Sequence, residues 1–234
     1  MVNKPGAGWG IPGTAGRSPR GYDRHMTFSR DERTALCRLL DEVGPDAPTL
    51  CEGWTTYDLA AHLVARERRP DAGPGLLVRQ FSAWTERVRL GEKRRPYPEV
   101  VDLVRGGPPA WSPMGLPVVE PVVNTVEYFV HHEDVRRAQD GWEPRELPRG
   151  LEEMLWRQLR ARSRMFFRRV PVGVVLRRPD GVTAPARSGT PEVQLVGQPG
   201  ELTLYAYGRR DHARVTVEGD EGAVKTLARA PVGL

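Results

Sequence analysis

The segment Asn124-Thr-Val-Glu127-Tyr-Phe-Val-His131-His132-Glu133-Asp134-Val135 decides how the whole chain is interpreted. An α-helix turns by about 100° per residue, so Glu127 and His131 lie one turn apart on the same face. Asp134 returns to that face within about 20°. A carboxylate and an imidazole placed in this way can bind one divalent metal ion, although such pairs also occur on ordinary helix surfaces. The segment therefore offers two metal ligands and leaves open where a third comes from.

The composition is that of a globular protein, with 39% hydrophobic and 28% charged residues in a chain of 234. No apolar run approaches the roughly 18 residues needed to cross a bilayer. The N-terminus also lacks the charged-then-apolar pattern of a signal peptide. Cys37 and Cys51 are the only cysteines, which fits a reducing compartment better than a disulfide scaffold. We therefore expect a cytoplasmic protein that does not enter a membrane.

The charge balance is basic, with a net charge of +5 and a sequence pI of about 9.5. Such a balance can indicate nucleic acid or an anionic substrate as a partner. Arginine is interleaved with Glu and Asp throughout, and no stacking platform or recognition motif accompanies the charge. We therefore expect no nucleic-acid binding, and a basic interaction module is the third of three interpretations.

Hydrophobic periodicity divides the chain into a helical part and a mixed part. Residues 1–25 are rich in Gly, Pro and Arg and are expected to form a disordered tail. Helices are expected from the Ser29 to Glu32 capping box to residue 43, and then at 57–67, 76–90, 98–104, 118–139 and 151–169. Strands are expected at 172–176, 193–196, 202–207 and 213–217, followed by a short helix at 222–229. The prediction is an α+β protein with a helical domain at 26–147 and a small α+β domain at 148–234.

The chain has five histidines from which a third ligand could come. His25 lies in the expected tail, His212 lies in a polar turn, and His132 points about 100° away from His131. His62 is left, on a different helix and beside its apolar face. An isolated histidine on such a face is often a hydrogen-bonded core residue, and this alternative stays open. If His62 joins Glu127 and His131, three ligands and one open position result, which is the pattern of a catalytic metal site.

Two parts of the sequence resemble the mycothiol-dependent maleylpyruvate isomerase family, one of the DinB-like metalloproteins. The first is Leu50-Cys-Glu-Gly-Trp54-Thr-Thr-Tyr-Asp58-Leu-Ala-Ala-His62-Leu, followed by Glu127-x-x-x-His131-x-x-Asp134. The second is Gly197-Gln-Pro-Gly-Glu-Leu-Thr-Leu-Tyr-Ala-Tyr-Gly208-Arg209, followed by Val215-Thr-Val-Glu-Gly-Asp220, which is similar to the C-terminal domain of that family. The resemblance implies a DinB-like four-helix bundle followed by a small α/β C-terminal domain.

The same resemblance implies a site. His62, Glu127 and His131 would hold a divalent metal, most often zinc, although this ligand set does not exclude nickel, iron or manganese. The cofactor would be the small thiol mycothiol, and Arg209 would face an anionic substrate or remain a solvated turn residue. Asp134 and, more weakly, Asn124 are candidates for hydrogen-bonding a ligand, with pairing of Asp134 to Arg66 or Arg137 as the alternative. Cys51 is interpreted as a small packed thiol, and a role as fourth ligand or redox group is its alternative.

Three functions follow from these observations. The first is a zinc-dependent isomerase or S-transferase that uses mycothiol on a small electrophilic substrate, with a metal-bound thiolate as the nucleophile. The second is a metal-binding protein of the same fold without catalysis or with another thiol. The third is the basic nucleic-acid or protein-interaction module. The substrate, the physiological metal and the oligomeric state do not follow from the sequence.

Overall fold

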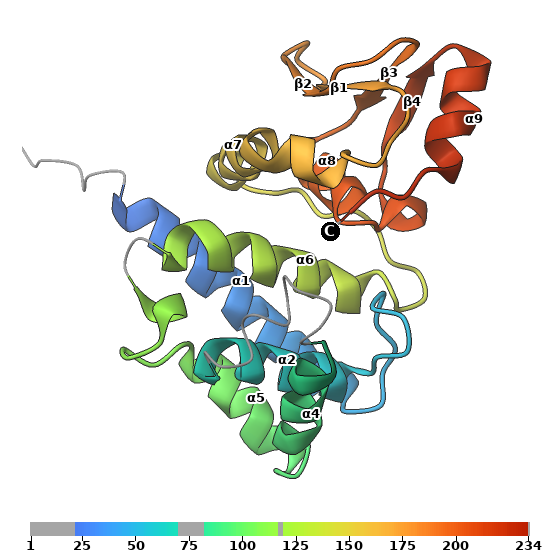
Figure 1. Ribbon diagram of the computed structural model, residues 1–234. Coiled ribbons are helices and arrows are strands. Elements are labelled where there is room, and N and C mark those ends of the chain that lie inside the picture. Colours follow the sequence, from blue (N-terminus) through green and yellow to red (C-terminus); the bar gives the residue numbers. More distant parts are fainter. Residues whose placement is uncertain (1–21, 70–81, 117–118, 234) are drawn as a thin grey trace, which may run out of the picture.

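The computed structural model describes residues 22–69, 82–116 and 119–233 (Figure 1). Most of the expected tail, residues 1–21, lies outside this part, and so do residues 76–81 of the helix expected at 76–90. The helical region contains α1 (Tyr22–Val43), α2 (Thr56–Arg68), α4 (Ser82–Glu92), α5 (Tyr97–Gly106), the 3-10 turn η3 (Pro113–Gly115), the π-helical turn η4 (Glu120–Asn124) and α6 (Thr125–Arg136). The mixed region contains α7 (Arg149–Phe166), β1 (Gly173–Arg177), β2 (Thr183–Arg187), β3 (Glu192–Val196), α8 (Pro199–Ala206), η5 (Arg210–His212), β4 (Thr216–Gly219) and α9 (Glu221–Arg229).

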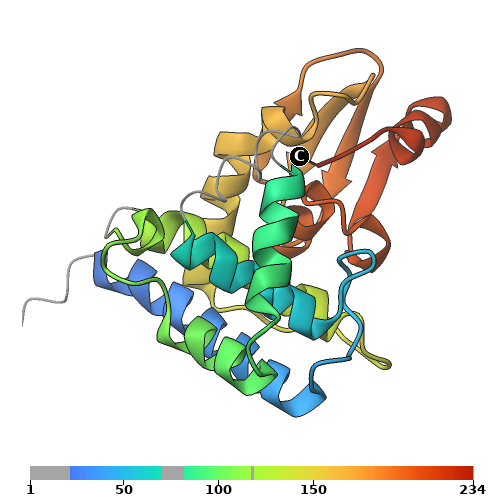
Figure 2. The same cartoon turned by 60° about the horizontal axis from the view of Figure 1, so that its bottom comes forward.

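The helical region is a bundle in which α1 packs against α5 and α6, and α2 packs against α4 and α5. Its core is formed by leucine, valine and alanine side chains of α1, α2 and α5, together with Tyr128 and Val135 of α6. Figure 2 shows α4 running across the direction of α1. The buried thiol of Cys37 belongs to this core, and burial raises its pKa to about 12. Cys37 is therefore a packing residue.

The mixed region is built on a four-stranded sheet in the order β2-β1-β3-β4. Strands β1 and β3 are parallel, whereas β2 and β4 run antiparallel to their neighbours. The second core lies between this sheet, α7, α8 and α9, and includes Phe166, Phe167, Leu176 and Leu195. The described residues thus form an α+β protein, a bundle of helices followed by a small region with a four-stranded sheet, in agreement with the α+β class that the sequence predicts.

The two regions meet at α6, which faces α7 and α8 in Figure 1. A third cluster of buried residues joins them, with Val126, Phe129 and Val130 of α6 packed on side chains of α7 and α8. Gly200 is one place where they approach closely, because a Cβ atom there would lie 2.8 Å from Leu147 Cδ1 and 3.3 Å from Phe129 Cζ. The helix that carries Glu127 and His131 is therefore packed on both sides.

Two local predictions are wrong, each for a physical reason. The strand expected at 202–207 is part of α8, and every residue of Pro199–Ala206 is buried. A short apolar run that is covered on all sides carries no helical period in its sequence. The capping box expected at Ser29 lies inside α1, which begins at Tyr22, so the last four residues of the expected tail are helical. The Glu32 carboxylate accepts from Arg145 instead of capping a helix.

None of the helices in the described ranges is both long enough and apolar enough to cross a membrane.

Candidate metal centre

Two helices bring three of the predicted site residues together. Thr55 caps α2, and its backbone amide donates to the Asp58 carboxylate at 3.1 Å, which fixes the start of the helix. His62 lies one turn after Asp58 and points towards α6. Glu127 and His131 lie one turn apart on α6, as their spacing predicts. The structure therefore brings His62, Glu127 and His131 to one place between α2 and α6.

The distances between these side chains suit a shared cation. Glu127 Oε1 lies 3.4 Å from His62 Nε2 and 3.3 Å from His131 Nε2. Ligand atoms bound at about 2.0–2.1 Å in a tetrahedron lie about 3.3 Å apart, so the observed separations match this geometry. All three donor atoms lie within 4.8 Å of one another, and the imidazole rings are buried. Two imidazoles and one carboxylate form a donor set that fits zinc and other borderline divalent ions.

Asp134 supports His131 from behind. His131 Nδ1 lies 2.9 Å from Asp134 Oδ2, and the carboxylate can only accept, so Nδ1 carries the proton. Nε2, the nitrogen left for a metal ion, faces Glu127 and His62. A carboxylate on the outer nitrogen of a metal-binding histidine fixes the tautomer and the ring orientation in this way.

Arg209 reaches the same carboxylate from the C-terminal region. Its Nε and Nη2 atoms donate to the two oxygens of Asp134, each at 2.7 Å, and Nη1 donates to the Tyr207 carbonyl. Asp134 thus pairs with Arg209 rather than with the other arginines considered from sequence, Arg66 and Arg137. The predicted position of Arg209 near the site agrees with this geometry, but its guanidinium already holds a protein carboxylate.

Cys51 lies on the Asp134 side of His131. Its thiol donates to Asp134 Oδ2 at 3.2 Å, and Arg209 Nη2 lies 3.4 Å from the sulfur. Cys51, His131 and Asp134 form a second group of donor atoms, but it gathers behind the ring rather than at Nε2. A cation held by Glu127 and His62 would therefore not meet Cys51 Sγ, so the geometry disfavours Cys51 as its fourth ligand.

Arg66, one turn after His62 on α2, was not among the residues predicted for the metal site. Its Nε atom lies 3.3 Å from Glu127 Oε1, and Nη1 donates to Asn124 Oδ1 at 2.9 Å. Asn124 is the last residue of the π-helical turn, and its amide donates to the Met114 carbonyl. Asn124 therefore reaches Glu127 only through Arg66. The i, i+4 spacing from His62 was the sequence signal that could have identified Arg66.

The electrostatics of the cluster follow from burial opposed by close partners. Burial alone would raise the pKa of Glu127, but Arg66 and the two imidazoles hold it well below its usual value. Burial lowers the pKa of His62. Burial would also lower the pKa of His131, but its contacts with Asp134, Cys51 and Glu127 raise it well above the usual value. Glu127 and Asp134 are therefore ionised, and each of these two carboxylates is partly balanced by an arginine.

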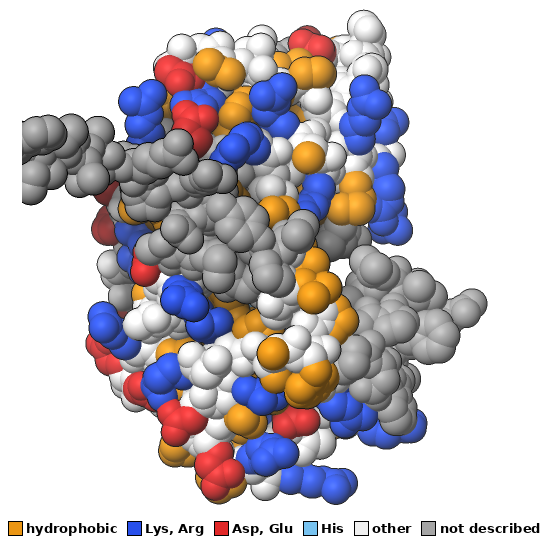
Figure 3. All heavy atoms as spheres, turned by 90° about the vertical axis from the view of Figure 1, so that its left-hand side faces the viewer, with side chains coloured by type: hydrophobic (Ala, Val, Ile, Leu, Met, Phe, Trp, Pro, Cys, Tyr) orange, Lys and Arg blue, Asp and Glu red, His pale blue; other side chains and the backbone are white. Residues whose placement is uncertain are grey.

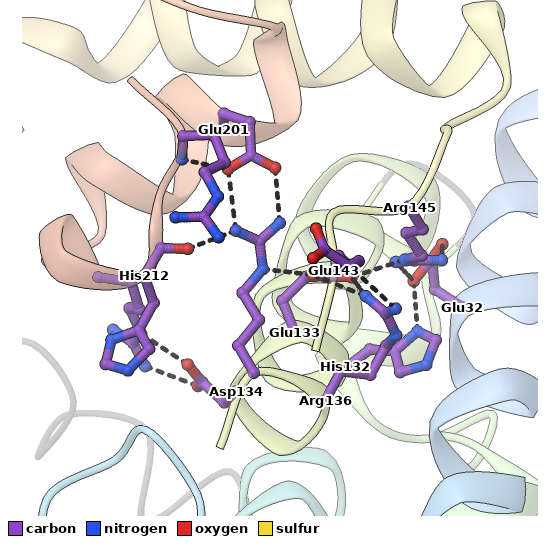
Figure 4. A network of polar contacts seen from close by, with 12 residues as sticks. Glu32, His132, Glu133, Asp134, Arg136, Glu143, Arg145, Glu201 and His212 are labelled. Carbon is purple, nitrogen blue, oxygen red and sulfur yellow. Dashed lines mark hydrogen bonds and ion pairs between the residues drawn. The ribbon is translucent and has the colours of Figure 1, made fainter. Parts of the chain in front are cut away.

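The other described histidines lie outside this cluster. His132 Nδ1 lies 3.0 Å from Glu32 Oε2, and Arg145 binds both oxygens of Glu32. Figure 4 shows this contact as part of a network that continues through Glu133 towards Glu201. His212 takes part through its backbone carbonyl, which accepts from Arg137. The side chain of His25 lies outside the described part of the chain.

Comparison with known proteins gives a family match for part of the chain and a fold match for most of it. The protein-family model named mycothiol maleylpyruvate isomerase N-terminal domain matches residues 29–72 of this chain, a range that includes His62. The predicted family resemblance is confirmed. Two solved structures cover 86% of this chain and 94% of their own: a mycothiol-dependent maleylpyruvate isomerase, with a TM-score of 0.53, and a histidine-to-alanine mutant of it, with a TM-score of 0.54. Both are 19% identical to this chain, so the likeness establishes a shared fold. No curated protein matches the chain.

Proposed function

We propose that this protein binds one divalent metal ion, most simply zinc, through His62, Glu127 and His131, and uses it in an isomerase or S-transferase reaction. Mycothiol would be the thiol, and a small electrophile would be the substrate. The observation that carries the proposal is the approach of two imidazole Nε2 atoms to one carboxylate oxygen at 3.3 and 3.4 Å. Two further features support it, the carboxylate behind His131 and the match of residues 29–72 to the mycothiol isomerase domain.

The residues of the chain have separate tasks in this proposal. A bound divalent ion would lower the pKa of a coordinated thiol and hold the resulting nucleophile in place. Three protein ligands leave one position for that thiol. Asp134 keeps His131 in the tautomer that offers Nε2. Trp54 packs its ring 5.2 Å from that of His62, which limits the rotation of this imidazole.

Two arginines place positive charge beside the site. Arg66 lies against Glu127, and Arg209 lies against Asp134. We retain Arg209 as the residue that faces an anionic substrate, with the added role of fixing Asp134. Since Arg209 follows α8, this role requires the C-terminal region to stay packed on α6.

We also propose that the chain divides near residue 147 into a metal-binding bundle, residues 26–147, and a C-terminal domain, residues 148–234. The separate hydrophobic cores support this division. One core is drawn from residues between Leu36 and Val135, and the other from residues between Trp156 and Ala230.

The test of the function has two stages. Protein purified without chelator should contain about one equivalent of divalent metal by elemental analysis. Mycothiol should then bind to the metal-loaded protein and not to the chelated protein in a calorimetric titration. Equal thiol affinity with and without metal would contradict thiol coordination.

The second candidate, a metal-binding protein without thiol chemistry, is favoured by the contact of Arg209 with Asp134, because a protein carboxylate already occupies the guanidinium proposed to face the substrate. It predicts one equivalent of metal and no mycothiol binding to either form. The two stages therefore separate the candidates.

A further inference from the structure

The positive charge of the protein is concentrated in one stretch of the C-terminal region. Residues 148–234 contain 15 Lys and Arg against 9 Asp and Glu, a net charge of +6, whereas the rest of the chain is slightly negative. Within this region, residues 154–179 contain eight arginines and no acidic residue. The interleaving of arginine with acidic residues expected from the sequence therefore fails here.

Helix α7 arranges several of these arginines in one exposed row. Arg157, Arg160, Arg164 and Arg168 follow one another at intervals of three or four residues, so they project from one side of the helix. All four side chains are exposed. Figure 3 views the molecule from the side on which α7 lies in Figure 1, and most charged side chains in its upper half are basic.

A hollow of about 520 Å³ lies beside this row, between α7 and the edge strand β2. Arg157, Arg160 and Arg164 supply all of the charge of its lining. The remaining lining residues are small or short: Ala161, Ser163, Ala184 and Pro185. Among the residues that the structure describes, no acidic side chain lines the hollow, and the small residues leave the guanidinium groups accessible to a ligand.

Two arginines of this hollow contrast with four arginines that are tied to carboxylates elsewhere in the described structure. Arg89, Arg137, Arg145 and Arg209 each form an ion pair with a carboxylate. Within the described ranges, Arg160 and Arg164 pair with no carboxylate. Like charges three or four residues apart destabilise a helix, and no acidic residue lies three or four positions from Arg160 or Arg164. An anion from outside the chain would offset the repulsion between these two charges.

Complementing the helix dipole explains only part of the row. A cation near a helix C-terminus is favourable, and Arg168 donates to the Met165 carbonyl there. That effect falls off within the last turn. Arg157 and Arg160 lie well before the last turn of α7, which ends at Phe166. The helix dipole therefore does not account for the positions of Arg157 and Arg160.

We infer that the hollow between α7 and β2 binds a phosphate-bearing anion through Arg157, Arg160 and Arg164. Guanidinium groups match phosphate oxygens with paired hydrogen bonds, and three of them around one hollow suit an anion with several charges. The phosphate can come from a free oligophosphate or from a nucleic-acid backbone. Among the described residues, none of the exposed large hydrophobic side chains is part of the lining of the hollow, so the site is expected to bind phosphate and not to stack on bases.

The test is a calorimetric titration of the full chain with sodium tripolyphosphate at low ionic strength. The double variant Arg160→Gln with Arg164→Gln should weaken binding by about tenfold or more, because each lost contact is a hydrogen bond between charged groups. The matched control is Arg30→Gln with Arg38→Gln, which removes two exposed charges from α1 and should leave the affinity within about twofold. Thermal unfolding should show that both variants fold.

A second arm identifies the source of the phosphate. A short DNA duplex that binds the wild type more tightly than tripolyphosphate, loses affinity in the α7 variant and keeps it in the control would make a polymer the source. Tighter binding of tripolyphosphate would make a free anion the source. Absence of binding of both ligands to the wild type would overturn the inference, and so would equal losses in the two variants. Chelating the metal should change none of these results.

Discussion

His131 and His132 are neighbours on α6, yet their surroundings differ in one decisive way. The carboxylate next to His132 is bound by both outer nitrogens of Arg145, at 2.6 and 2.9 Å, so its charge is balanced. Glu127, next to His131, has one arginine contact at 3.3 Å and two imidazole nitrogens at similar distances. Helix α6 therefore carries a closed ion-pair network on one face and a set of converging donor atoms on another. Histidine beside glutamate is common to both faces, and the placement of arginine separates them.

The largest expected difference between the two histidines is in metal binding, and replacing each of them in turn tests it. His131→Ala should abolish stoichiometric metal binding, because it removes one of three ligands, whereas His132→Ala should keep about one equivalent. Elemental analysis after gel filtration measures both. Retention of the metal in both His131→Ala and His62→Ala would rule out the proposed ligand set.

The ion-pair network around Glu133 should contribute to the free energy of unfolding and not to metal binding. Arg137 joins Glu133 of α6 to Glu201 of α8, and its side chain is 2% exposed. Arg137→Met should lower the free energy of unfolding by about 3–5 kcal/mol, because it leaves two buried carboxylates short of a partner. Chemical denaturation measures this change.

The matched control for that variant is Arg136→Met. Arg136 also pairs with Glu133 but is 25% exposed, so the expected loss is below about 1 kcal/mol. Equal losses in the two variants would mean that burial of the network does not decide its contribution.

Glu67 offers the same contrast within the bundle. It is as deeply buried as Glu133, but no arginine of the described ranges is bound to it. Burial raises its pKa to about 7 despite the hydrogen bond from Tyr128, and Oε2 has no partner among the described residues. The unfolded chain loses this proton near pH 4.5 and the folded chain near pH 7. The stability that Glu67 contributes is therefore complete below pH 4.5 and is lost as the pH rises through about 7.

Unfolding measured across this range should show the effect. Relative to Glu67→Gln, which cannot ionise, the wild type should lose up to about 3 kcal/mol between pH 4.5 and 7.5. Parallel curves for the two proteins would show that Glu67 is ionised in the folded state.

Replacing Asp134, which hydrogen-bonds to His131, should change metal affinity less than removing a ligand. Asp134→Asn should weaken metal affinity by about ten- to a hundredfold, because the amide no longer fixes His131 with a full negative charge. Competition with a chelator of known affinity measures this. Cys51→Ser, which alters another contact of the same carboxylate, should change the affinity much less, and an equal loss would assign the support to Cys51.

How much could be predicted from sequence depended on whether a contact was local. The shared face of Glu127 and His131 follows from helix geometry alone, and the apolar face of α2 pointed to His62. The partner of Asp134 was not predictable, because Arg209 lies 75 residues away and only tertiary packing brings it there. The strand expected at 202–207 was wrong because a helix buried on every side has no polar face to reveal its period. Arg66 had a local signal, its spacing from His62, but its role emerges only when α6 is in place.

The bidentate contact between Arg209 and Asp134 also limits how this protein can be recombined. The residue that fixes a proposed metal ligand of the bundle is itself fixed by a residue encoded about 75 codons later. A chimera that takes its C-terminal region from a relative would inherit the bundle's His131 and Asp134 but not necessarily the arginine. Without it, Asp134 would remain buried beside His131 with one fewer counter-charge. The two halves of the gene are therefore expected to exchange as a matched pair, with this arginine and this aspartate kept or changed together.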